Sequence, residues 1–362
     1  MVEGVVGLGG GDPYLPSPGN VRVAAKKAID SGYTHYYVSS ELKCAVAEML
    51  KEDSGIDVDL GWAITITSGG LNALFSTILA TVNPGDEVLM PIPYFPRFRQ
   101  ITITARAVPV YYSLLEDEIW RPDLEELEKG ISSKTRLLIL NSPNNPTGGV
   151  INLKDLKVIS EIAQERNLLV LSDEVYANVV YYPSRHYSIT SLPGMEERTV
   201  IIGSVSKAYA MCGWRVGWVV CCNRDLAKRI DSVVSQMIST PCSVSQIAAL
   251  EALRTPKALT KGMLRMWRRH RDIAYNRLME MPGIRCQKAK GALYMFPDHS
   301  RIIKSSLEFV EFLIKEAKVS LGAGSHYGKD GHVRLGFSCQ PMDKLELGLE
   351  RMEKAIRKVM RR

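Results

Sequence analysis

The sequence alternates short apolar runs with longer segments in which apolar residues recur every three or four positions. The short runs lie at 64–67, 87–90, 107–112, 136–140, 168–171 and 200–203. The longer segments include 21–31, 41–51, 71–82, 124–130 and 153–163. Short runs of this kind are typical of buried strands, and the longer spacing is that of helices. A chain that repeats strand and helix builds a parallel sheet with helices on both faces, so we predict an α/β fold.

The segments that follow the predicted strands are rich in polar and small residues. They lie at 68–70, 93–96, 141–148, 172–176 and 203–207. Right-handed crossovers bring such segments to one rim of a parallel sheet. Open α/β sheets bind their ligands at the carboxyl ends of strands. We therefore expect the functional site on this rim.

Lys207 stands near the carboxyl end of the predicted strand at 200–203. A lone lysine is usually a solvated surface residue. Here we expect a partly desolvated amine with a lowered pKa, which makes Lys207 a candidate Schiff-base nucleophile. Ser204, Ser206 and Arg215 lie close to it in the sequence and suit a phosphate group.

Two glycine-rich segments are further candidates. Gly69 and Gly70 turn the strand at 64–67 into a helix, and the free N–H groups of a helix amino terminus attract anions. Residues 8–18 are rich in glycine and proline, which predicts an extended loop. Gly10 in this loop would let the backbone approach a ligand closely, and the alternative is a plain linker.

Composition excludes several classes of protein. The net charge of +7 is dispersed, and no nucleic-acid-binding module is recognisable. The seven cysteines form no C-x-x-C pair, which argues for reduced thiols and against a zinc site or a disulfide framework. No apolar run approaches membrane-spanning length, and residues 1–4 do not begin a signal peptide. We expect a cytoplasmic protein that binds neither nucleic acid, membrane nor metal.

Several short motifs occur together in a specific order. They are Asn-Pro-Thr-Gly at 145–148, Asp-Glu-Val-Tyr at 173–176, Ser-Val-Ser-Lys at 204–207 and Gly-Trp-Arg-Val-Gly at 213–217. Gly-Ala-Leu-Tyr at 291–294 and Arg-Leu-Gly-Phe-Ser at 334–338 follow. With these motifs the chain resembles the fold-type I pyridoxal-phosphate (PLP) enzymes from about residue 8 to its carboxyl terminus. It is most similar to the class I/II aminotransferases of the aspartate aminotransferase superfamily.

The resemblance implies a role for each motif residue. Lys207 would hold PLP as an internal aldimine and, once freed, act as general base and then acid. Asp173 would keep the cofactor's ring nitrogen protonated, with Glu174 as the alternative. Asn145 and Tyr176 would bind the phenolic oxygen, and Phe95 would stack on the ring. The residues implied for the phosphate are Gly69, Gly70, Ser204, Ser206 and Arg215.

The resemblance also implies how substrates bind and react. Arg334 would grip the substrate α-carboxylate, ideally as a bidentate pair, and Asn145 and Gly10 would assist. The implied reaction is ping-pong transfer of the α-amino group of an L-amino acid to a 2-oxo acid. Because the same cofactor site supports other chemistry, a carbon–sulfur β-lyase is the alternative enzyme. A non-catalytic PLP-binding regulator is the alternative from another class, and it would need an attached DNA-binding domain.

The amino donor is the least determined feature. Bacterial aspartate aminotransferases that this chain resembles carry a lysine just after the Gly-Gly turn, whereas Leu71 stands here. A distal carboxylate without a cation is costly to bury. We therefore expect a broad range of aspartate, aromatic or aliphatic donors, with 2-oxoglutarate as an acceptor. The other possibility is an aspartate enzyme in which Arg97 or a partner residue supplies the charge.

The resemblance further implies two domains and a homodimer. The small domain would comprise 1–30 and 282–362, the large PLP-binding domain 31–256, and the helix between them 257–281. Residues 238–246 resemble the segment that crosses to the partner's cofactor. A tyrosine of each subunit would reach the partner's site, and both Tyr36 and Tyr37 are candidates. Closed two-fold dimers are the commonest oligomers.

Overall fold

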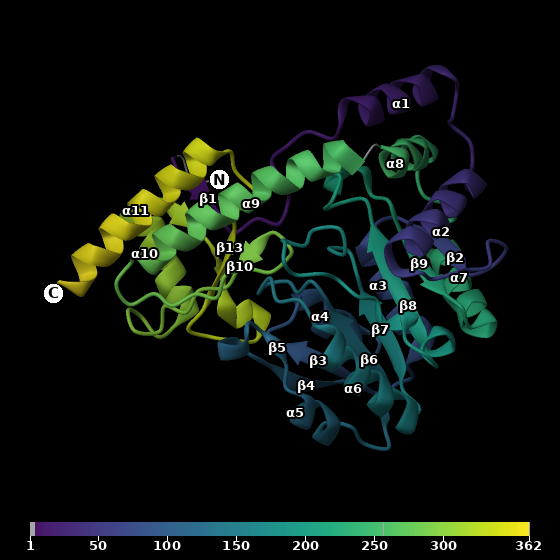
Figure 1. Ribbon diagram of the computed structural model, residues 1–362, viewed down its shortest axis with the longest axis horizontal. Helices are drawn as coiled ribbons and strands as arrows, with labels where there is room; N and C mark the ends of the chain where they lie inside the picture. Colours follow the sequence, from purple (N-terminus) through teal and green to yellow (C-terminus); the bar gives the residue numbers. More distant parts are fainter. Residues whose placement is uncertain (1–3, 256, 362) are drawn as a thin grey trace.

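We describe residues 4–255 and 257–361 of the protein from a computed structural model. The first three residues and the last residue of the predicted small domain lie outside the described residues, as does residue 256 at the predicted end of the large domain. The predicted α/β fold is confirmed: the core is an eight-stranded sheet with helices on both faces (Figure 1).

The large sheet has the strand order β2-β9-β8-β7-β6-β3-β4-β5. Its strands are β2 Ile64–Thr67, β3 Glu87–Ile92, β4 Val108–Leu115, β5 Arg121–Pro122, β6 Thr135–Asn141, β7 Leu169–Asp173, β8 Thr199–Ser204 and β9 Gly217–Cys221. The five strands from β8 to β4 are parallel, whereas β9 runs antiparallel to both its neighbours and β5 antiparallel to β4. The central strands are buried almost throughout, as expected for strands covered on both sides.

Successive residues of one strand point to opposite faces of the sheet. Leu137 and Ile139 of β6 pack with α3 Gly70–Thr81, α4 Pro96–Thr104 and α7 Arg224–Ile238. Leu138 and Leu140 pack on the other side with α5 Leu124–Lys129 and α6 Leu153–Glu165. At the β2 end of this second face lie α2 Ser40–Ser54 and α8 Ser243–Arg254. Successive side chains of a strand point to opposite faces of the sheet. A strand whose residues are all apolar therefore contributes to the hydrophobic cores on both faces.

A second, smaller unit follows the long helix α9 Lys257–Met279 (Figure 1). Its three-stranded sheet has the order β10-β13-β12, and β1 pairs in parallel with β11. The strands are β1 Val6–Gly7, β10 Tyr294–Met295, β11 Val319–Ser320, β12 Gly322–Ala323 and β13 Val333–Gly336. The helices α10 Ser306–Ala317 and α11 Met342–Met360 complete it. β10 is only two residues long, because Ala292 has a φ of 55° and turns the chain out of the sheet.

The amino-terminal segment contacts both units. β1 pairs with β11, whereas α1 Gly19–Asp30 lies beside α8 (Figure 1). Asn20 of α1 donates hydrogen bonds to Glu251 at 2.8 Å and to Thr255 at 2.9 Å. The predicted domain boundaries stay a prediction.

Candidate active site

A pocket of about 340 Å³ opens at the carboxyl ends of the parallel strands. It is lined by Gly11, Gly70, Leu71, Leu74, Phe95, Asn141, Asn145, Asp173, Val175, Tyr176, Ser204, Ser206, Lys207, Cys212, Arg215, Tyr294 and Arg334. All five predicted rim segments contribute, so the expectation that they meet is confirmed. Another hollow of about 270 Å³, between α2 and α9, contains none of the predicted site residues.

Lys207 follows β8 and places its amine in this pocket. Its Nζ donates a hydrogen bond to the Gly11 carbonyl at 2.7 Å and lies 3.5 Å from Cys212 Sγ. Burial by itself lowers the pKa of Lys207, but Tyr294, Cys212 and Asp12 outweigh it and raise the pKa above its ordinary value. The predicted lowering of this pKa is therefore wrong, because the neighbours that the fold supplies stabilise the charged amine.

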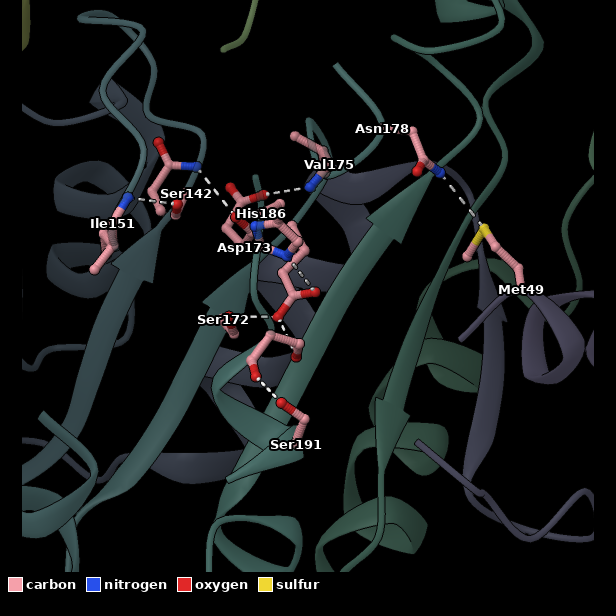
Figure 2. A network of polar contacts seen from close by, with 12 residues as sticks. Met49, Ser142, Ile151, Ser172, Asp173, Val175, Asn178, His186 and Ser191 are labelled. Carbon is pink, nitrogen blue, oxygen red and sulfur yellow. Dashed lines mark hydrogen bonds and ion pairs between the residues drawn. The ribbon is translucent and has the colours of Figure 1, made fainter. Parts of the chain in front are cut away.

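Asp173 ends β7 and lies in the pocket with its carboxyl group buried. Burial raises its pKa to about 7; the Val175 N–H and Lys207 oppose this rise, and Glu174 adds to it. The Val175 N–H donates to Asp173 Oδ1 at 3.3 Å (Figure 2). The pocket thus holds one carboxyl group poised to gain a proton or to pair with a cation.

Glu174 does not line this pocket. Its carboxylate accepts hydrogen bonds from Ser172 at 2.8 Å and Ser188 at 2.7 Å, and it lies 3.1 Å from His186 Nε2. Figure 2 shows His186 and Ser172 within this network. Burial by itself raises the pKa of Glu174, but His186 and the two hydroxyls lower it overall. We therefore regard Glu174 as a structural anchor.

The predicted phosphate residues gather at the start of α3. Ser204 and Ser206 place their hydroxyl oxygens 2.7 Å apart. Arg215 adopts a φ of 55° and donates through Nη1 to the Cys212 carbonyl at 2.7 Å. Gly69 has a φ of 85°, and a Cβ there would lie 2.5 Å from Arg215 Nη2. Glycine is needed at 69 because both the backbone angle and the close guanidinium exclude a side chain.

Arg334 of β13 reaches the pocket from the small unit. Its Nη1 donates to Asn145 Oδ1 at 2.9 Å and its Nη2 to the Gly9 carbonyl at 2.6 Å. The buried Nε has no hydrogen-bond partner among the described residues. Buried polar groups are normally paired, so this unpaired donor is an exception within the described residues.

Tyr176, Phe95 and Gly10 complete the predicted set. The Tyr176 hydroxyl lies 2.8 Å from the Tyr294 hydroxyl, and Phe95 lines the pocket with its ring edge-on to Phe98. Gly10 lies in a neighbouring shallow hollow with Gly9, while the adjacent Gly11 lines the pocket itself.

Comparison with known proteins shows the family of this chain. The family model for aminotransferase class I and II matches residues 3–352. Aromatic-amino-acid aminotransferase 2 of Thermococcus litoralis is 39% identical over 98% of this chain and 92% of its own length. Aspartate aminotransferase of Pyrococcus abyssi is 38% identical with the same coverage. The crystal structure of an aromatic aminotransferase from Pyrococcus horikoshii superimposes with a TM-score of 0.95, at 37% identity, covering 99% of this chain and 97% of that one.

The chain belongs to the class I and II aminotransferases. Enzymes of this family use PLP. The residues of this aminotransferase fit that cofactor: a buried carboxyl for the ring nitrogen, an amine for the aldehyde, and hydroxyls, an arginine and a helix amino terminus for the phosphate. The pocket volume of about 340 Å³ is within the usual range for small-molecule sites, roughly 300–1,000 Å³.

The aminotransferase pocket also contains residues to which the sequence assigned no role. Tyr294 belongs to the motif at 291–294, which was a usable signal, and Asn141 begins the segment at 141–148. Cys212 carried no signal, because its place beside Lys207 depends on the turn that follows β8. Burial raises the pKa of the Cys212 thiol to about 11, so it remains protonated at neutral pH.

One wall of the pocket is apolar. This wall consists of Leu71, Leu74 and Phe95. Among the described residues, Lys207 is the only lysine that lines the pocket. Arg97 is exposed in an adjoining hollow that also contains Phe95 and Arg334, and it donates to Gln100 at 2.6 Å.

Two segments that the sequence related to the partner subunit lie together. Gln246 of α8 donates to the Tyr37 carbonyl at 2.8 Å, and Ser243 hydrogen-bonds the Tyr33 carbonyl at 2.5 Å. The Tyr37 ring packs edge-on against Tyr33, whereas Tyr36 is 85% exposed.

Within the described ranges, no helix of this aminotransferase has the length and apolar character needed to cross a membrane. Over the same residues, no cluster of three histidine, cysteine or acidic side chains is arranged to hold a metal ion.

Proposed function

We propose that this aminotransferase binds PLP covalently at Lys207 and moves the α-amino group of an L-amino acid to a 2-oxo acid such as 2-oxoglutarate. The observation that carries the proposal is the convergence of Lys207, Asp173, Tyr176 and Arg334 on one pocket. These residues come from different elements, so their meeting is a property of the fold and not of a single motif. PLP supplies an electron sink when bound.

The side chains divide the work between charge and proton transfer. Asp173 would hold a proton on the cofactor's ring nitrogen, and the positive charge of that group would offset the burial that raises the pKa of this carboxyl. Lys207 Nζ removes the proton from the substrate α-carbon and acts as base and acid in turn. Tyr176 and Asn145 would donate hydrogen bonds to the cofactor's phenolic oxygen.

Arg334 binds the substrate α-carboxylate. Its Nε is buried without a partner, and its Nη1 already bonds Asn145, which orients the guanidinium plane. A planar guanidinium binds carboxylates bidentately and excludes most other geometries. All L-amino acids share the α-carboxylate. By binding this group, the Arg334 guanidinium would place the α-carbon of each of them at the same position.

We propose a broad range of amino donors, both aspartate and aromatic or aliphatic amino acids. Leu71, Leu74 and Phe95 form an apolar wall that suits large side chains. The similar proteins include one named for aromatic amino acids and one named for aspartate. The exposed Arg97 is the candidate cation for a distal carboxylate.

We also propose a cytoplasmic homodimer in which Tyr36 reaches the partner's pocket. Tyr36 is the more exposed of the two candidate tyrosines, and Tyr37 is held by Tyr33 and Gln246. The seven free cysteines are consistent with a reducing compartment. Sedimentation should give a dimer, and a catalytically active monomer would contradict the proposal.

The test of the proposed chemistry uses the purified, cofactor-loaded protein. Borohydride should fix the cofactor on the peptide that contains Lys207, and the Lys207→Ala variant should show no such adduct. With an amino acid alone, the reaction should stop after one turnover per site and resume when 2-oxoglutarate is added. Continuous release of ammonia and pyruvate would identify a β-lyase. Absence of any reaction would indicate a protein that binds the cofactor without catalysis.

A further inference from the structure

Tyr294 of β10 is 1% exposed, yet it contacts three groups of the pocket. We propose that Tyr294 is a positioning residue that holds both Tyr176 and Arg334, so that the phenolic-oxygen donor and the substrate-carboxylate site are kept in fixed relation. The inference rests on the proposed function and assigns a role to a residue outside the implied catalytic set.

The first contact is with Tyr176. The two hydroxyl oxygens lie 2.8 Å apart, and the rings meet edge-on at 5.8 Å between centroids. If Tyr176 donates its only hydrogen to the cofactor's phenolic oxygen, its own oxygen is left to accept a hydrogen bond from elsewhere. The Tyr294 hydroxyl can supply it: its one hydrogen has the Gly11 carbonyl at 3.4 Å as the other acceptor, and Tyr176 at 2.8 Å is the nearer. Such linked hydrogen bonds strengthen each other.

The second contact is with the guanidinium of Arg334. Its Cζ lies 4.4 Å from the centroid of the Tyr294 ring and 5.0 Å from that of Tyr327. Because Nη1 and Nη2 are already bonded to Asn145 and Gly9, ring contacts fix the remaining tilt of the plane. Cation–π contacts of this kind are favourable, and more so where water is excluded.

The third contact explains a glycine in the amino-terminal loop. A Cβ at Gly11 would overlap the Tyr294 hydroxyl and lie 3.0 Å from its Cζ. The Gly11 carbonyl accepts from Lys207 Nζ at 2.7 Å and lies 3.4 Å from the Tyr294 hydroxyl. The Gly11 carbonyl is therefore within reach of both the Lys207 amine and the Tyr294 hydroxyl.

A residue that only filled space would tolerate loss of its hydroxyl. The chain offers a matched control in Tyr181, which is also buried. Its hydroxyl donates to the Ala292 carbonyl at 2.9 Å, and its ring lies 4.4 Å from Arg271 Cζ. Tyr181 thus makes the same two kinds of contact but does not line the pocket.

The hydroxyl is tested by titrating the visible absorbance of cofactor-loaded Tyr294→Phe. Without the hydroxyl, Tyr176 donates less strongly to the phenolic oxygen, so the ionised form of that oxygen is less stable. We expect the pH midpoint of the absorbance change to rise by about 0.5–1 unit relative to the unsubstituted enzyme. Tyr181→Phe should leave the midpoint unchanged.

The ring is tested by binding of 3-phenylpropionate, an unreactive carboxylic acid, to protein with and without cofactor. Tyr294→Leu should raise its Kd about five- to tenfold, whereas Tyr294→Phe should remain within about twofold. An unchanged midpoint in Tyr294→Phe, or an unchanged Kd in Tyr294→Leu, would overturn the proposal. Thermal melts check that all variants are folded. If the PLP assignment is wrong, the unsubstituted protein will form no borohydride-stable adduct, which is a separate result. Binding of 3-phenylpropionate to cofactor-free protein would still test the role of the Tyr294 ring.

Discussion

Asp173 and Glu174 are consecutive and both buried, yet their pKa values move in opposite directions. Asp173 faces the pocket, where burial raises its pKa to about 7. Glu174 faces away and is held by Ser172, Ser188 and His186. Neighbouring residues at a strand end point to opposite sides, so one carboxyl is available for chemistry and the other for structure.

Asp173→Asn should lower the rate of amino transfer by about a hundredfold or more, because the amide cannot stabilise a protonated ring nitrogen. In cofactor-free protein, the raised pKa means that stability contributed by the protonated carboxyl is lost as pH rises from about 4 through 7. At pH 8 the variant should therefore melt at a higher temperature than the unsubstituted protein, and its free energy of unfolding should be larger by at most about 4 kcal/mol. Thermal melts at pH 5 and pH 8 measure this, and parallel pH profiles would contradict it.

Glu174→Gln should affect stability more than chemistry. Because the pKa of Glu174 is lowered below its ordinary 4.5, its contribution to stability is present above that value and is lost as pH falls through the folded-state pKa. We expect a loss of about 1–3 kcal/mol at neutral pH, measured by denaturant unfolding. KM should change less than about threefold. A variant with full stability and lost turnover would show that the two carboxyls had been assigned in reverse.

Arg334→Lys keeps the charge but removes the fork. KM for the amino donor should rise about 10- to 100-fold, while the visible spectrum of the bound cofactor stays unchanged. Arg351→Lys is the control, since Arg351 donates to the Gly4 carbonyl at the surface. Steady-state kinetics with one donor and 2-oxoglutarate give both values. An unaltered KM would exclude Arg334 from carboxylate binding.

Leu71→Lys should favour acidic donors. Leu71 lines the pocket and is 42% exposed, so a lysine there can place its amine near a distal carboxylate without being buried. We expect kcat/KM for aspartate relative to phenylalanine to rise about tenfold or more. Leu307→Lys, at a 49% exposed site on α10, should leave the ratio unchanged. If the unsubstituted enzyme already prefers aspartate by more than about a hundredfold, the broad-range proposal is wrong.

Tyr36→Ala should lower cofactor affinity about tenfold or more, because the contact proposed for its hydroxyl in the partner's pocket is lost. Mixing this variant with Lys207→Ala should restore activity at up to about a quarter of the sites, since each mixed dimer contains one complete pocket. Tyr182→Ala, at a 78% exposed position, is the control for loss of a surface tyrosine. No recovery on mixing would place Tyr36 outside the partner's site.

The sequence was sufficient for the architecture. Uninterrupted apolar runs such as 136–140 predicted strands covered on both faces, and Leu137 and Leu138 do pack into opposite cores. The rim was also predictable, because parallel strands with right-handed crossovers must bring their carboxyl ends together. The helices α7 and α8 and the strand β9 were not predicted, although the spacing of Leu226, Ile230 and Val234 carries a helical signal. Strands as short as β1 and β12 carry no periodic signal, since two residues cannot show alternation.

What only the tertiary structure decided is how the local electrostatics and hydrogen bonds are arranged. The sequence shows that Lys207 follows a buried strand, but its pKa is raised by Tyr294 and Asp12, which are distant along the chain. Arg334 and Asn145 are 189 positions apart and bond at 2.9 Å. Secondary-structure propensity and hydrophobic periodicity depend on residues that are close in the chain, so they can be predicted from the order of the amino acids alone. A pKa or a hydrogen bond depends on which distant groups the fold brings within a few ångströms, and no local pattern carries that information.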